Sequence, residues 1–70
     1  MDRTRVRSSN ISSIGYAEDS RTLEVEFNTG TIYQYSRVPE SVYNALMGAR
    51  SHGSYFNENI RDNYSTRQVR

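Results

Sequence analysis

The clearest pattern in the chain is a strict alternation of apolar and polar residues over positions 23–27, Leu-Glu-Val-Glu-Phe. Such an alternation is typical of a β-strand that buries one of its two faces. We expect another strand around residues 14–16, before a polar turn, and a third over residues 31–36, which are rich in β-branched and aromatic side chains. Together these segments predict a three-stranded antiparallel β-meander.

The turn before the third strand decides which sheet face carries Tyr33 and Tyr35. A two-residue loop would put both on the face of the glutamates, but it would force β-branched Thr29 to a positive φ angle. A three-residue loop over residues 28–30 needs a left-handed conformation only at Gly30. We favour this longer loop, which gives two cross-strand pairs: Val25–Tyr33 and Leu23–Tyr35.

The first hairpin agrees with this register, because Tyr16 falls opposite Leu23 whether the loop has two residues or four. One face of the meander then collects the expected core: Ile14, Tyr16, Leu23, Val25, Phe27, Tyr33 and Tyr35. The other face, which we expect to meet solvent or a partner, carries Glu24, Glu26, Ile32 and Gln34.

A helix is expected after Val38, because Pro39 suits the first position of a helix. Apolar residues then recur at i, i+3, i+4 and i+7, which predicts one stripe that covers the sheet: Val42, Ala45, Leu46 and Ala49. Gly48 should weaken this helix without ending it.

A break is expected at residues 51–53, Ser-His-Gly, with Gly53 in the left-handed cap conformation. Residues 55–61 then fit a second short helix, in which Phe56 and Ile60 share one face. The predicted fold class is therefore α+β: a three-stranded antiparallel β-meander followed by one main helix and a second short helix, both packing on one sheet face.

The length of 70 residues limits the chain to one domain, which we place at residues 9–64. The polar ends are expected to be a flexible arm, residues 1–8, and a frayed tail, residues 65–70. Only thirteen residues are Leu, Ile, Val or Phe, but a net charge of +1 and six tyrosines still favour a folded core. A chain this short buries about 60% of its surface, so self-association would add stability.

Cysteine is absent, which excludes disulfides and thiolate metal sites, and His52 is the single histidine. We therefore expect neither a metal nor a cofactor. The N-terminus has no apolar stretch after its charges, and no apolar run approaches the roughly 20 residues that cross a bilayer. These features predict a soluble, cytoplasmic protein that does not contact a membrane.

The ordered set of residues resembles the KTSC domain family over residues 9–64, and its most specific part is the last segment. The matching positions are Ser9, Ile14-Gly15-Tyr16, Leu23, Val25, Phe27, Gly30, Tyr33, Tyr35, Val38-Pro39, Val42-Tyr43, Leu46, Ala49, Ser51, Gly53, Tyr55-Phe56-Asn57 and Ile60-Arg61. Copies of the domain at the C-terminus of some lysyl-tRNA synthetases imply RNA binding. Most members are free-standing small proteins of bacteria and their phages, which implies a similar origin here.

The residues do not support an enzyme. The chain lacks a His–Cys or His–Ser–Asp set with a supporting spacing, and it has no phosphate loop of the P-loop type. Glu24 and Glu26 are interpreted as a solvated strand face. Outward-facing Tyr33 and Tyr35 would favour RNA, because bases stack on sheet-borne aromatic rings, but the preferred register places them in the core.

Candidate ligand-binding residues gather near the break between the helices. Small residues there lead into a helix N-terminus, where free N–H groups favour an anion. Arg61 lies four residues after Asn57 and so on the same helix face. The candidate set is Ser51, His52, Tyr55, Asn57, Arg61 and, from the third strand, Tyr35.

Each polar candidate in this segment also has an ordinary structural explanation. Ser51 suits a helix cap, and the Asn57 side chain suits a hydrogen bond to the backbone. Arg61 suits a surface ion pair, and a lone histidine such as His52 is more often a loop residue than a ligand.

Our leading hypothesis is a non-enzymatic, homo-oligomeric protein that captures a phosphate-bearing nucleotide, such as a signalling nucleotide sequestered by a phage-type protein. All nine basic residues are arginine, whose planar fork suits phosphate, although codon bias explains the same composition. The alternatives are an RNA- or tRNA-binding accessory domain and a protein–protein interaction module. The pI of about 8.1 and the interleaved acids speak against a protein that tracks a long nucleic acid.

Overall fold

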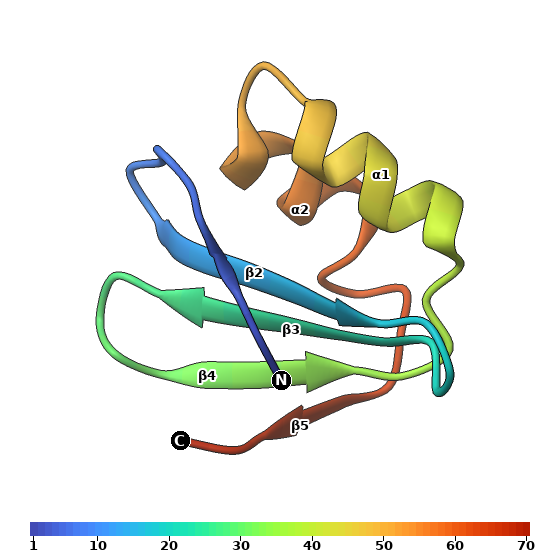
Figure 1. Ribbon diagram of the computed structural model, residues 1–70. Coiled ribbons are helices and arrows are strands. Elements are labelled where there is room, and N and C mark those ends of the chain that lie inside the picture. Colours follow the sequence, from blue (N-terminus) through green and yellow to red (C-terminus); the bar gives the residue numbers. More distant parts are fainter.

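The computed structural model describes residues 1–70, in which two helices pack on one face of a five-stranded antiparallel sheet (Figure 1). The strands lie side by side in chain order: β1 (Thr4–Arg5), β2 (Ile11–Ala17), β3 (Thr22–Phe27), β4 (Ile32–Tyr35) and β5 (Thr66–Gln68). The helices α1 (Glu40–Gly48) and α2 (His52–Asn59) lie between β4 and β5 in the sequence. This confirms the α+β class.

The predicted number of three strands is wrong, because the polar ends of the chain add a short strand at each edge of the sheet. β1 pairs with β2, and β5 pairs with β4. Both edge strands are short, and their residues are exposed. Edge strands of this kind carry little apolar alternation, so the pattern that reveals the inner strands is missing from them.

The register of the inner strands agrees with the three-residue loop. Val25 pairs with Tyr33 and Leu23 with Tyr35. Gly30 has a φ angle of 95°, and its N–H donates to the carbonyl oxygen of Phe27 at 2.9 Å. Glycine adopts such an angle without a steric penalty, which is why the loop takes this form. The expected pairs of the first hairpin, Ile14–Val25 and Tyr16–Leu23, are confirmed as well.

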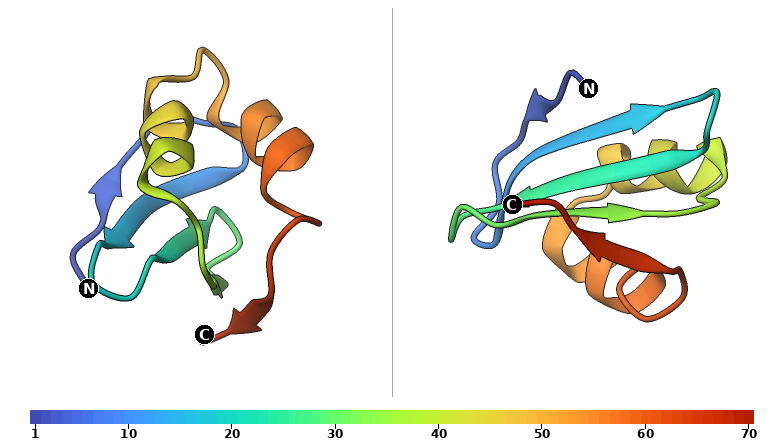
Figure 2. Two further views of the ribbon diagram at one scale, coloured as in Figure 1. Left: turned by 90° about the vertical axis from the view of Figure 1, so that its right-hand side faces the viewer. Right: turned by 90° about the horizontal axis from the view of Figure 1, so that it is seen from below.

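The sheet face opposite the helices is covered more than expected. Glu24 and Ile32 are buried there, with exposed fractions of 6% and 5%. The Arg3 guanidinium donates to the Glu24 carboxylate, and Arg70 donates to Glu26 at 3.0 Å. Figure 2 shows the N-terminal segment on the side of the sheet away from the helices. The chain ends therefore shield a face that we expected to meet solvent or a partner.

Helix α1 differs from the prediction at both ends. Pro39 occupies the N-cap, one residue before the helix, and Ala49 already has an extended conformation, so the helix ends at Gly48. The carbonyl oxygen of Leu46 accepts the Ala49 N–H at 3.3 Å and contacts His52 Nδ1 at 2.9 Å. These bonds satisfy a carbonyl that the helix leaves free, which accounts for the early end.

Helix α2 begins earlier than expected, and Gly53 lies inside its first turn instead of in a left-handed cap. Ser51 is the N-cap, because its Oγ accepts the Ser54 N–H at 3.2 Å. Once Ser51 caps the helix, the break falls before His52 and Gly53 takes a helical conformation. Phe56 and Ile60 are both buried, which confirms their shared apolar face.

The core lies between the sheet and the two helices. Its buried members are Ile11, Ile14, Leu23, Val25, Tyr35, Val38, Leu46, Phe56 and Ile60. At one end of this layer Tyr16 stacks on Tyr43, with ring centroids 4.9 Å apart, and its hydroxyl donates to the Val38 carbonyl oxygen. Neither helix is long and apolar enough to cross a membrane.

Candidate ligand-binding groove

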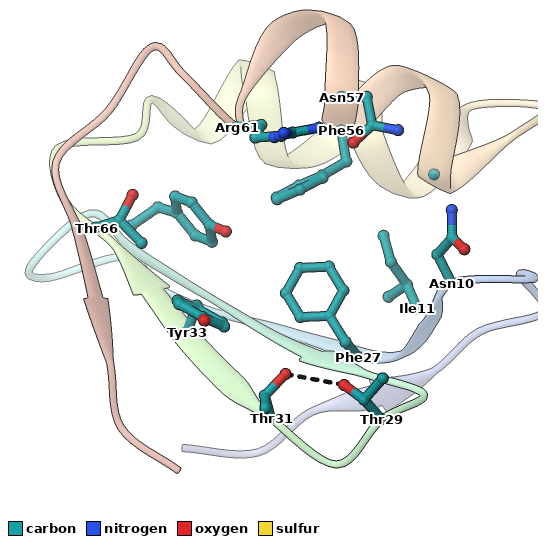
Figure 3. A pocket seen from close by; sticks show the side chains of 12 residues that line it. Asn10, Ile11, Phe27, Thr29, Thr31, Tyr33, Phe56, Asn57, Arg61 and Thr66 are labelled. Atoms are coloured by element: carbon teal, nitrogen blue, oxygen red, sulfur yellow. Dashed lines mark hydrogen bonds between the residues drawn. The ribbon is translucent and has the colours of Figure 1, made fainter.

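An open groove of about 520 Å³ lies between α2 and the helix-facing side of the sheet (Figure 3). We call it the aromatic groove. It is lined by Asn10, Ile11, Phe27, Thr29, Thr31, Tyr33, Tyr35, Gly53, Phe56, Asn57, Arg61 and Thr66. Its volume falls within the range of about 300–1,000 Å³ that is common for small-molecule sites.

The floor of the aromatic groove is built from rings that meet edge to face. Phe27 contacts Tyr33 at a centroid distance of 5.8 Å and Phe56 at 5.4 Å, with interplanar angles of 77° and 70°. Tyr35 contacts Phe56 at 5.4 Å and 79°. Phe27 and Tyr33 are only half-buried. In each of these contacts the edge of one ring covers a face of the other, so the apolar surface open to a ligand comes from the half-buried rings of Phe27 and Tyr33.

Tyr35 supplies a polar group inside this apolar setting. The residue is 4% exposed, yet its hydroxyl has no hydrogen-bond partner within the chain. No fully buried side-chain polar atom lacks a partner, so this hydroxyl must open into the aromatic groove. Burial, with a smaller contribution from Tyr33, raises the pKa of Tyr35 to about 12, although Arg61 acts in the opposite direction. The hydroxyl is therefore a neutral donor at physiological pH.

Arg61 and Asn57 lie along the upper wall of the aromatic groove, as expected from their spacing of four residues (Figure 3). Both residues are exposed. The ion pairs of the chain involve Arg3 and Arg70 and leave Arg61 without an acidic partner. An unpaired guanidinium above an apolar floor is available to an anionic ligand.

Three of the predicted site residues lie outside the lining of the aromatic groove: Ser51, His52 and Tyr55. Ser51 caps α2, and His52 contacts the Leu46 carbonyl oxygen. Tyr55 is half-buried and packs against the core. The structure therefore brings together Tyr35, Asn57 and Arg61, and it gives the other three contacts that hold the helices in place.

Four residues of the lining were not predicted from the sequence as parts of a site: Phe27, Tyr33, Asn10 and Thr66. The first two were already assigned to the helix-facing side of the sheet. The aromatic character of these two residues was an available signal, because rings on a sheet face can also stack on bases. Asn10 and Thr66 carry no such signal, because they reach the aromatic groove only through tertiary contacts.

The polar network on the opposite sheet face forms no comparable site. Glu24 accepts from Arg3 and from Gln34, the latter at 2.8 Å. Burial alone would raise the pKa of Glu24, but the hydrogen bonds from Gln34 and Arg3 lower it below its ordinary value. These side chains are bonded to one another, which leaves them less free for a ligand than the groups of the aromatic groove.

A family model described as the KTSC domain matches residues 7–64. The crystal structure of a KTSC domain protein from Yersinia pestis superposes with a TM-score of 0.96. The match covers 99% of this chain and 97% of that one, at 39% sequence identity. The sheet and helices described above are therefore shared with a solved relative.

Two kinds of relative appear among curated proteins. An uncharacterized protein of Stutzerimonas stutzeri is 43% identical over 58 residues, which cover 83% of this chain and 82% of that protein. The lysine–tRNA ligase of Nostoc punctiforme is 36% identical over 59 residues, which cover 84% of this chain. That match spans only 10% of the ligase, so the likeness concerns a small part of a much longer protein.

Proposed function

The chain belongs to the KTSC domain family, and for this member we propose a non-enzymatic role in which the aromatic groove binds a phosphate-bearing nucleotide. The observation that carries the proposal is the unpartnered hydroxyl of Tyr35. It opens into an apolar groove that Arg61 also lines without an acidic partner. A neutral donor beside a free guanidinium suits an anion.

The floor suits the base of such a ligand. Phe27 and Tyr33 are half-buried and present apolar ring surface along the groove, and the buried Phe56 packs against Phe27. Stacking of a base on an aromatic side chain contributes about 1–3 kcal/mol. The ring surface therefore suits a flat base, and the hydroxyl and the guanidinium suit an anionic phosphate.

Binding without conversion fits the chemistry of the lining. The twelve residues include no acid, imidazole or thiol. Tyr35 stays protonated near neutral pH, because its pKa is raised to about 12, so it suits a donor and not a general base. The groove thus offers groups that hold a nucleotide and none that is poised to take up a proton from it.

A homo-oligomer remains part of the proposal. Only 14 of the 70 residues are buried, so the monomer has a small core. Association would cover further apolar surface, and symmetric dimers are the commonest outcome for soluble chains. Native mass spectrometry measures both the subunit number and any small molecule that is retained.

The test of the site is calorimetric titration of the purified protein with a panel of nucleoside monophosphates. Tyr35→Phe removes only the hydroxyl, and Arg61→Ala removes the charge, so each should weaken binding about tenfold or more. Tyr43→Phe and Arg50→Ala are matched controls outside the groove and should leave affinity unchanged. Equal affinities for the wild type and both groove variants would refute the site.

A second candidate is an RNA-binding role, which the likeness to lysine–tRNA ligases favours. One nucleotide of a strand would then occupy the aromatic groove, and exposed arginines near the chain ends would contact the backbone. Binding that neutralises several phosphates weakens steeply with salt, whereas a pocket for one nucleotide weakens less. Titration of a short single-stranded RNA and of a mononucleotide at 50 and 200 mM salt separates the two candidates. A module that binds only other proteins would respond to neither ligand.

A further inference from the structure

Two side-chain amides flank the same end of the aromatic groove. Asn57 lies on α2, and Asn10 precedes β2 (Figure 3). Three other asparagines bond backbone carbonyl oxygens through Nδ2: Asn28, Asn59 and Asn63. The amides of Asn10 and Asn57 have no such bond within the chain, and both residues are exposed. Each therefore keeps one donor and one acceptor for a ligand.

The backbone around Asn10 is held so that its amide reaches the groove. Ser8 Oγ accepts the N–H groups of Asn10 and Ile11, each at 3.2 Å. Gly53 leaves room for the amide, because a Cβ built on it would lie 3.2 Å from Asn10 Nδ2. A glycine weakens the first turn of α2, so a close approach of the amide accounts for its presence there.

The opposite end of the aromatic groove has a different character. Thr66 is the cross-strand partner of Tyr35, and Figure 3 places Thr66 at the end away from Asn10. The Tyr35 side chain therefore enters the groove from that end, and Arg61, which acts on the pKa of its hydroxyl, also lies on the side of Asn57 away from Asn10. One end offers amide donors and acceptors, and the other offers a neutral donor suited to phosphate.

We propose that the two amides read the edge of an adenine ring, so that the groove selects adenine nucleotides. This inference rests on the proposed function of the groove as a nucleotide site. In adenine the amino donor stands between two ring nitrogens that accept, so an amide on either side finds an adjacent donor and acceptor. Asparagine makes this bidentate match with adenine, whereas guanine presents two neighbouring acceptors that suit arginine.

The first test changes the ligand and leaves the protein intact. AMP and IMP differ at the base only by the exchange of the amino group for an oxo group and the ring proton that accompanies it. We expect AMP to bind about tenfold tighter than IMP or more, and tighter than GMP, in calorimetric titration. Equal affinity for AMP and IMP would overturn the adenine assignment.

Single-residue variants then show which side chains distinguish AMP from IMP. Asn57→Ala and Asn10→Ala should each reduce the ratio of AMP to IMP affinity toward one, while Asn44→Ala on α1 should leave it unchanged. Tyr35→Phe should weaken AMP and IMP by the same factor, because it acts at the phosphate end. If AMP and IMP bind with equal affinity and Tyr35→Phe weakens both, the nucleotide site is supported and the proposed selectivity for adenine is refuted. If AMP, IMP and GMP all fail to bind, both proposals are overturned.

Discussion

The substitution Gly53→Ala sets two structural effects against each other. Gly53 has an ordinary helical conformation, because the only glycine with a positive φ angle is Gly30. Alanine at a compatible position stabilises a protein by about 0.4–1 kcal/mol, since it reduces the conformational entropy of the unfolded chain. The opposing effect is steric: the new Cβ would meet Asn10 Nδ2 at 3.2 Å and Ser8 Oγ at 3.6 Å.

The steric effect should be the smaller one. A separation of 3.2 Å requires a shift of a few tenths of an ångström, and the atom that must move is the end of an exposed side chain with no hydrogen bond to lose. We therefore expect a net gain of about 0.5 kcal/mol. In a domain of this size that gain corresponds to a rise in Tm of about 2–4 °C. The same shift displaces the Asn10 amide, so affinity for AMP should fall while stability rises.

Urea and thermal denaturation followed by circular dichroism measure the stability, and calorimetry measures the affinity. Gly48→Ala is the matched control, because a Cβ there meets nothing within 4 Å and the full entropic gain should appear without any change in binding. The double variant Gly53→Ala/Asn10→Ala should be more stable than Gly53→Ala alone, since the contact is gone. A loss of more than about 1 kcal/mol in Gly53→Ala would refute the reasoning, because it would mean that the backbone and not a side chain resists the methyl group.

Three further predictions concern Ser51, Glu24 and Tyr35. Ser51→Ala removes the α2 cap and should lower the free energy of unfolding, measured by urea denaturation, by about 1 kcal/mol. Its affinity for AMP should be unchanged. A variant that loses affinity but keeps full stability would show that Ser51 contacts the ligand. Because the pKa of Glu24 is lowered in the folded state, its stabilising effect is complete above its unfolded pKa and disappears as pH falls through the folded one. Glu24→Gln should therefore flatten the loss of stability as pH falls below about 5 in urea denaturation, and an unchanged pH profile would contradict this. Because the pKa of Tyr35 is raised to about 12, stability should fall as pH rises from about 10 toward that value. Tyr35→Phe should remove the last step of the tyrosinate absorbance titration, and a last step that persists in the variant would refute the assignment.

The inner part of the fold follows from local information. Alternation over β3 marks its buried face, and the three-residue loop requires one left-handed residue, which Gly30 provides. Since side chains alternate with a period of two, these two facts suffice to put Tyr33 and Tyr35 on the helix-facing side. The same kind of local spacing predicted that Asn57 and Arg61 lie close together, and both line the aromatic groove. Arg61 nevertheless lies beyond the end of α2, which the structure places at Asn59.

The errors arise where contacts join distant parts of the chain. β5 pairs with β4 across more than thirty residues, and its exposed polar strand has no pattern of its own. The end of α1 depends on a bond between His52 and Leu46 that helical propensity does not describe. For the same reason, the sequence did not show that His52 contacts the end of α1.

The sequence alone therefore determined the α+β class and the register of the meander, because each depends on patterns within short segments. It also determined the family resemblance, from an ordered set of residues over 9–64, and it named three residues that line the candidate groove: Tyr35, Asn57 and Arg61. The tertiary structure decided the contacts between distant segments, which the turn and helix patterns do not specify. It supplied the two edge strands and the buried outer face, and it brought Asn10 and Thr66 to the two ends of the aromatic groove. A groove is a shape enclosed by separate elements, so its walls and its free polar groups exist only once those elements have packed.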